Sequence, residues 1–137
     1  MSAILNPNND TTQFIVGKYA SGGSIANTFI EGGNRYVLAA KQGDSSNVFI
    51  DFPVVKNLNG SPYSFGSRDD LYQDTQTQSL FSLYWQQVPN TEFTKIGWTS
   101  TSWSMWNTQE LIIYNNNQAS NISSIEANIN SHYSIYP

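Results

Sequence analysis

Apolar residues alternate with polar ones along much of this chain, and turn-forming residues interrupt the alternation roughly every ten residues. Successive side chains of a β-strand point to opposite faces, whereas a helix repeats after about 3.6 residues. The period of two therefore predicts short strands with one buried face. It constrains the fold strongly, because strands joined by short turns assemble into antiparallel sheets.

The predicted strands are separated by turns rich in Gly, Pro, Asn and Ser. The turn Gly32-Gly33-Asn34 is the clearest hairpin signal, because glycine adopts positive φ without steric penalty. We expect strands at 12–19, 24–30, 35–41, 47–53, 79–87, 91–98, 109–114 and 131–136.

Two segments depart from the simple pattern. Residues 56–78 contain many turn formers, so we expect a long loop with a short strand at 63–65 or one helical turn near 69–72. Residues 122–129 have isoleucines at helical spacing, but Ser, Asn and β-branched Ile favour a strand. The whole chain, residues 1–137, is predicted to be a single domain. Its expected fold is an all-β antiparallel β-sandwich, jelly-roll-like, with eight to ten short strands.

Neutral polar residues replace charge in this chain. Asn, Gln, Ser and Thr make up 53 of the 137 residues, against ten acidic and six basic residues and a net charge of −4. The 19 aromatic residues and the low charge are the reverse of a disordered composition. The basic residues are scattered, which argues against nucleic acid or anionic lipid as the main partner.

The residue inventory also limits catalysis and metal binding. There are no cysteines, and the single histidine, His132, has no acidic residue near it in sequence to hold it as a catalytic base. We therefore predict a protein that is not an enzyme and needs no cofactor. The densest acidic group, Asp69, Asp70 and Asp74, is expected to be solvated, with calcium as the alternative because that ion prefers oxygen ligands.

Residues 1–7 lack the basic start and apolar run of a signal peptide, and no stretch approaches the ~20 apolar residues of a spanning helix. The expectation is a soluble protein, cytoplasmic or released by a non-classical route.

All four tryptophans lie between Trp85 and Trp106, and residues 98–109 carry no charge. In a single strand, Trp98 and Trp106 would share one face and Trp103 the other, each together with hydroxyl residues. An ordinary half-buried strand does not have this pattern. The segment is therefore either part core and part sheet rim, or a surface that meets a partner.

Three functional classes remain open. The first is a lectin-like protein that binds a glycan or a glycoprotein surface, with aromatic rings stacked on sugar and neutral polar groups bonded to hydroxyls. Its predicted ligand-binding residues are Trp98, Trp103, Trp106, Asn107 and Tyr72. The second is a self-assembling fibre, shell or inclusion-body subunit, a homo-oligomer whose low charge permits strand pairing. The third is a small membrane-active β-toxin, because Trp and Tyr favour the membrane interface.

Overall fold

The computed structural model describes residues 10–19, 43, 45, 54–64, 66–86 and 107–137. It also describes the backbone, without side chains, of residues 27–28, 30–32, 35–36, 39–40, 93–96 and 106. The predicted strand at 47–53 lies outside these residues, as do Trp98 and Trp103. In the described residues, none of the helices has both the length and the apolar character needed to cross a membrane.

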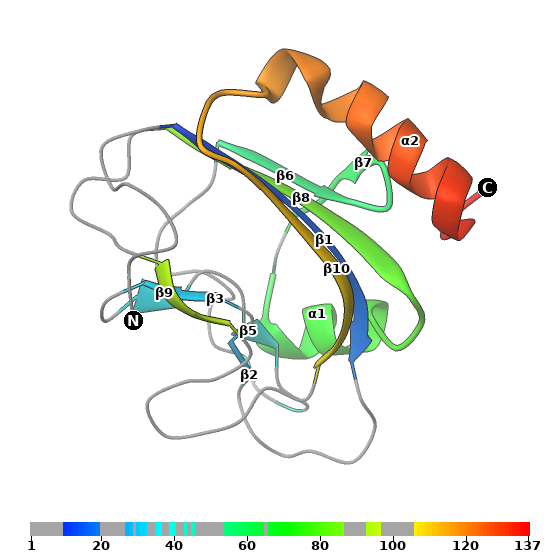
Figure 1. Ribbon diagram of the computed structural model, residues 1–137. Coiled ribbons are helices and arrows are strands. Elements are labelled where there is room, and N and C mark those ends of the chain that lie inside the picture. Colours follow the sequence, from blue (N-terminus) through cyan, green and yellow to red (C-terminus); the bar gives the residue numbers. More distant parts are fainter. Residues whose placement is uncertain are drawn as a thin grey trace.

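A curved, open sheet of five antiparallel strands forms the centre of the structure (Figure 1). Its spatial order is β10-β1-β8-β6-β7, so the first long strand lies between two later ones. The strands are β1 (Thr11–Tyr19), β6 (Val55–Leu58), β7 (Ser61–Pro62), β8 (Ser79–Trp85) and β10 (Trp106–Tyr114). The mostly-sheet character predicted from the alternation is confirmed, as are the strands at 12–19, 79–87 and 109–114.

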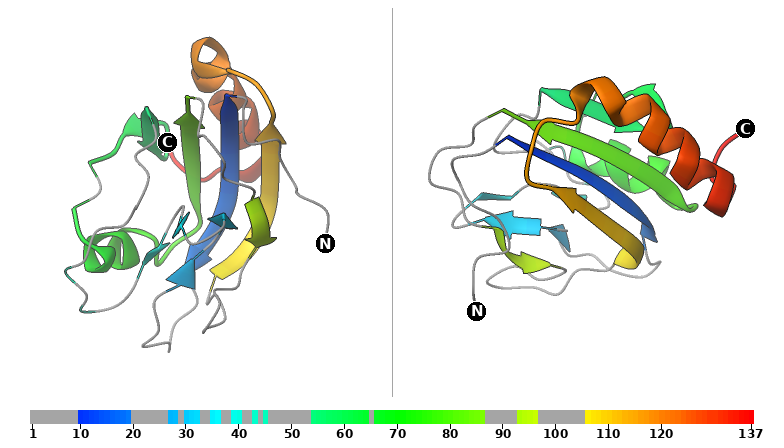
Figure 2. Two further views of the ribbon diagram at one scale, coloured as in Figure 1. Left: turned by 90° about the vertical axis from the view of Figure 1, so that its left-hand side faces the viewer. Right: turned by 45° about the horizontal axis from the view of Figure 1, so that its top comes forward.

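The C-terminal helix α2 (Ile122–Tyr133) covers the convex face of this sheet (Figures 1 and 2). Its buried residues Ile122, Glu126 and Ile129 follow helical spacing and point toward the strands. The short η1 (Ala119–Asn121) precedes it. The strand predicted at 122–129 is therefore wrong, and so is that at 131–136, whose first three residues complete α2. Burial of one apolar stripe against a sheet outweighs the weak helix propensity of Ile, Ser and Asn.

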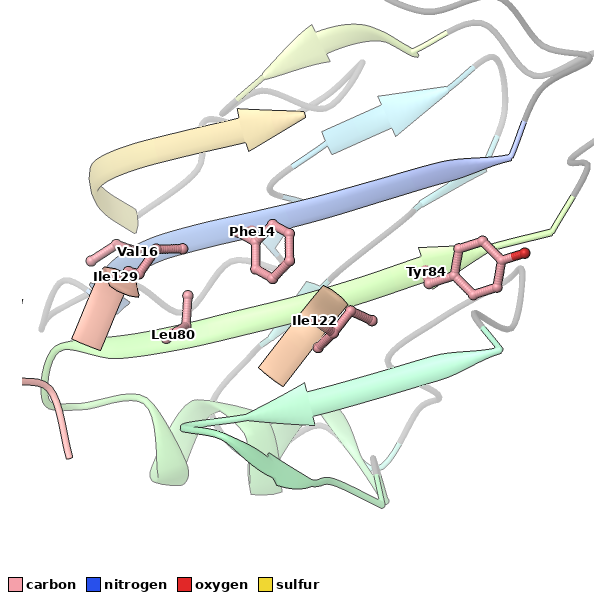
Figure 3. Packing of buried hydrophobic residues seen from close by; sticks show 6 residues of the cluster. All are labelled: Phe14, Val16, Leu80, Tyr84, Ile122 and Ile129. Carbon is pink, nitrogen blue, oxygen red and sulfur yellow. The ribbon is translucent and has the colours of Figure 1, made fainter. Parts of the chain in front are cut away.

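The core between α2 and the sheet comes from alternate strand positions (Figure 3). Residues paired across antiparallel strands point to the same face, so one face collects the even-numbered residues of β1 and β8. The buried members of this cluster are Phe14, Val16, Leu80, Tyr84, Ile122 and Ile129. An apolar core layer therefore joins the sheet to α2.

The concave side of the sheet faces the helix α1 (Arg68–Asp74) and the smaller strand pairs (Figure 2). Those pairs form from β2 (Asn27–Thr28) with β5 (Ala39–Ala40), and from β3 (Ile30–Gly32) with both β4 (Arg35–Tyr36) and β9 (Phe93–Ile96). Pairing of β3 with β4 on either side of residues 33–34 confirms the predicted hairpin. Within the segment expected to be a loop, α1 confirms the helical turn, whereas the short strand lies at 61–62 and not at 63–65.

Candidate functional site

A β-bulge interrupts the pairing of β1 with β10. Val16 is opposite Glu110, but the next residue, Gly17, is opposite Thr108, so Gln109 is the extra residue on β10. A Cβ atom on Gly17 would lie 2.8 Å from the backbone oxygen of Asn107, which is too close for any other residue without a backbone shift. Glycine is therefore required here by the approach of the two strands.

A cavity of about 220 Å³ opens at this bulge. Apart from Gly17, its walls carry hydrogen-bonding side chains: three amides, one hydroxyl and one ammonium group. All except Gln78 are exposed, and Gln78 is half-buried. The cavity is lined by Gly17, Lys18, Gln78, Asn107, Thr108 and Gln109. We refer to these six residues as the bulge site.

The side chains of the bulge site are available for a ligand. In the described part of the chain, Lys18, Gln78, Asn107, Thr108 and Gln109 make no side-chain hydrogen bond. A side-chain amide offers two donors and one acceptor oxygen, and Lys18 offers donors only. The arrangement can therefore bind several hydroxyl or carbonyl groups of a polar ligand at once.

The segment between α1 and β8 holds one wall of the bulge site in place. The backbone N–H of Tyr19 donates to the carbonyl of Thr75 (2.8 Å), which ties the C-terminal end of α1 to β1. The fully buried Thr75 donates its hydroxyl to the Leu71 carbonyl (2.6 Å), and Ser79 donates to the Thr77 carbonyl (3.1 Å). Gln78 thus projects from a backbone fixed on both sides.

The structure brings three of the five predicted ligand-binding residues to this end of the sheet. Asn107 lines the cavity, and Trp106, described here by its backbone alone, pairs with Tyr19 of β1. The ring of Tyr72 packs edge-on against Tyr19 with 4.6 Å between ring centroids, and Tyr72 is 9% exposed. Tyr72 therefore supports the site from the core. Trp85 is also buried.

The acidic residues considered for calcium have partners within the protein. Asp70 accepts the backbone N–H of Ser67 (2.7 Å) in a capping box at the start of α1, and these bonds lower the pKa of its carboxyl. Asp69 accepts the backbone N–H of Gly43 (2.6 Å), and Asp74 accepts the hydroxyl of Tyr63. Over the described ranges, no three acidic or histidine side chains gather as metal ligands would.

The opposite end of the β1–β10 ladder uses the same residue types differently. There Thr12 donates its hydroxyl to the Asn116 carbonyl (3.1 Å) and accepts the backbone N–H of Gln118 (3.0 Å). Asn117 donates to the Tyr84 hydroxyl (2.9 Å), which in turn donates to Asp10 (2.8 Å). Burial, and then the Asp10 carboxylate, raise the pKa of Tyr84. We call this set the turn network.

Sequence reasoning did not identify five members of the bulge site, namely Gly17, Lys18, Gln78, Thr108 and Gln109. A usable signal was present, because an isolated glycine inside a strand pattern, here Gly17, indicates a bulge or a close backbone approach. The partner strand and the adjoining loop could not be assigned without knowing the strand order.

Comparison of the chain with protein-family models, with curated proteins and with solved structures found no match. Function is therefore inferred from the residues of the site itself.

Proposed function

We propose that this protein is a non-enzymatic, lectin-like carbohydrate-binding protein and that the bulge site is its sugar-binding site. The observation that supports this most strongly is the set of uncommitted amide and hydroxyl groups around one small cavity. Asn107, Gln109 and Gln78 would bond sugar hydroxyls as both donors and acceptors. The predicted contribution of Trp98, Trp103 and Trp106 as stacking surfaces remains part of the proposal.

The chemistry of the lining favours a sugar over other ligand classes. Only Lys18 carries charge there, whereas a nucleic-acid site uses several cations to neutralise phosphates. The cavity is smaller than the ~300–1,000 Å³ typical of sites that enclose a drug-sized molecule. It therefore suits one small hydroxylated ring that projects from a larger glycan.

The strand pairs on the concave side support a second layer, so the proposed architecture remains a sandwich-like one. Calcium near Asp69, Asp70 and Asp74 remains a prediction that a titration with the metal would test. Sugar binding at the bulge site requires neither the second layer nor calcium.

A glycan array probed with the labelled protein tests the proposal. We expect retention on a limited set of glycans, and we expect Asn107→Ala to weaken it by about tenfold, as expected for loss of a well-made hydrogen bond. The matched control is Asn115→Ala, which removes another exposed amide, in the turn after β10. Absence of binding to every glycan, or equal loss in both variants, would overturn the proposal.

Self-assembly is the second candidate, and the edge position of β10 favours it. Within the described five-stranded sheet, β10 has a strand partner on one side only. It carries the half-buried apolar residues Leu111, Ile112 and Ile113, and a long apolar edge readily pairs with another chain. Light scattering would then show a dimer or larger species that Ile113→Lys converts to a monomer. A monomeric wild-type protein at high concentration would exclude this candidate.

A further inference from the structure

A second cavity, of about 460 Å³, lies between β10 and the last two turns of α2. Ile112 and Ile129 supply its apolar surface, and Asn128 and His132 supply polar groups from the helix. Its volume is larger than that of the bulge site, and it has both apolar and hydrogen-bonding walls. We refer to it as the helix groove.

An aromatic pair forms part of the helix groove. The rings of His132 and Tyr133 meet edge-on, with 4.6 Å between centroids and 89° between planes. The Tyr133 hydroxyl donates to the Glu110 carboxylate across the groove, and burial together with that carboxylate raises the pKa of Tyr133. Tyr133 thus connects α2 with β10 at this groove. The exposed His132 ring beside it is open to a ligand.

The strand register connects the helix groove to the bulge site. Val16 and Glu110 are paired and point toward α2, and the next row on the same face contains Lys18 and Asn107. Rows on one face are about 7 Å apart along a strand, so the rows of Lys18, Val16 and Phe14 span roughly 14 Å. Gln109 lines the first cavity and Glu110 the second, so the two cavities are neighbours along β10.

The dimensions and lining of the two neighbouring cavities restrict the chemical class and the length of the ligand. A single sugar ring can occupy the bulge site but cannot also reach across three strand rows. Apolar walls and an aromatic ring suit the C–H faces of sugars, and the flanking amides suit their hydroxyls. One neutral, hydroxyl-rich chain would therefore find matching groups in both cavities.

We propose that the ligand is an oligosaccharide of at least two units that runs along β10, with one unit in the bulge site and the next in the helix groove. His132 and Tyr133 form the second subsite. This inference depends on the proposed sugar-binding function and extends it to the length of the ligand.

The test is calorimetric titration of the full-length protein with oligosaccharides of one to six units. Four probe series are used: α-linked glucose, β-linked glucose, β-linked N-acetylglucosamine and β-linked galactose. In the series that binds, we expect affinity to rise about tenfold between one unit and three, because the second cavity becomes occupied. His132→Ala should weaken trisaccharide binding about fivefold and leave the monosaccharide within about twofold.

Two further variants separate ligand contact from helix disruption. Tyr133→Phe keeps the ring but removes the bond to Glu110, and Ser124→Ala changes an exposed α2 residue that lines neither cavity. We expect a partial loss of trisaccharide binding in the first and no change in the second. Length-independent affinity, or His132→Ala affecting all lengths equally, would overturn the second subsite while leaving sugar binding intact. No binding in any series and on the glycan array would overturn both.

Discussion

The two ends of the β1–β10 ladder contain similar neutral polar residues but use them in opposite ways. At the Thr12 end, amides and hydroxyls bond to one another and to the backbone, and Thr12 itself is fully buried. At the Gly17 end, a bulge interrupts the regular pairing of the strands, and exposed Asn and Gln side chains lie around a cavity. The difference lies in their surroundings, since both ends draw on the same residue types.

This contrast shows why composition could not locate the site. A hydrogen bond inside the protein stabilises the fold by about 1 kcal/mol. An exposed amide without a partner contributes little to folding stability but can bond to a ligand. Substitutions at the turn network should therefore change stability, and those at the bulge site should change binding.

The largest effect on stability is expected from Thr12→Val. The variant keeps the shape of the side chain but removes the hydroxyl that serves both Asn116 and Gln118. We expect the free energy of unfolding to fall by about 2 kcal/mol, since a backbone N–H loses its partner. Urea denaturation measures this, and sugar affinity should stay unchanged. A fall below about 0.5 kcal/mol would show that the turn network contributes little.

Gly17→Ala should affect both properties. The new methyl group would meet the Asn107 backbone at 2.8 Å, so the strands must move apart, at a cost of about 1–2 kcal/mol. We expect the bulge site to lose its shape and glycan binding to fall by at least about tenfold. Gly43→Ala is the control, because Gly43 has positive φ (71°) and would be strained but lies outside the cavity. Equal binding loss in both would indicate general destabilisation.

Alkaline pH should weaken the turn network. An unfolded tyrosine ionises near pH ~10, and the folded-state pKa of Tyr84 is raised. The protonated Tyr84 hydroxyl makes its full contribution to stability below about pH 10. That contribution is lost as pH rises through the folded-state pKa of Tyr84, so the free energy of unfolding falls above pH ~10. Denaturation at a series of pH values measures the slope, which Tyr84→Phe should reduce. The slope of the free energy of unfolding against pH should not vanish in this variant, because burial also raises the pKa of Tyr63 and Tyr136. An identical slope in the variant would contradict the assignment.

The smallest effect on stability is expected from Gln109→Ala. Gln109 is exposed and is the unpaired residue of the bulge, so the free energy of unfolding should change by no more than about 0.5 kcal/mol. Glycan affinity should nevertheless fall several-fold. Denaturation and titration of the same preparation measure both. A large loss of stability would place Gln109 with the structural residues instead.

The sequence was informative where local pattern and tertiary environment agree. The alternation over 12–19 predicts β1, and the glycine turn at 32–34 predicts the pairing of β3 with β4. The same pattern wrongly predicted a strand at 122–129, because it could not show that the isoleucines of α2 pack against one face of the sheet. The competing helical spacing at Ile122 and Ile129 was the correct signal.

The candidate site was less accessible from sequence for a topological reason. Asn107 was selected because it follows the tryptophan-rich segment, yet three of the five residues that share its cavity come from β1 and from the residue before β8. Nothing local to Lys18 or Gln78 indicates that β1 lies between β8 and β10. Tyr72 was selected as an aromatic residue of a polar loop, but the amphipathic helix α1 turns it into the core.

The most direct test of the central contrast is nuclear magnetic resonance of the side-chain amide groups during titration with a glycan selected on the array. We expect the side-chain signals of Asn107, Gln109 and Gln78 to shift together and to saturate. The Asn116, Asn117 and Gln118 signals should stay in place, since their bonds are already made within the protein. Shifts confined to the turn network, or no shift of any signal at saturating glycan, would contradict the contrast between the two ends of the ladder.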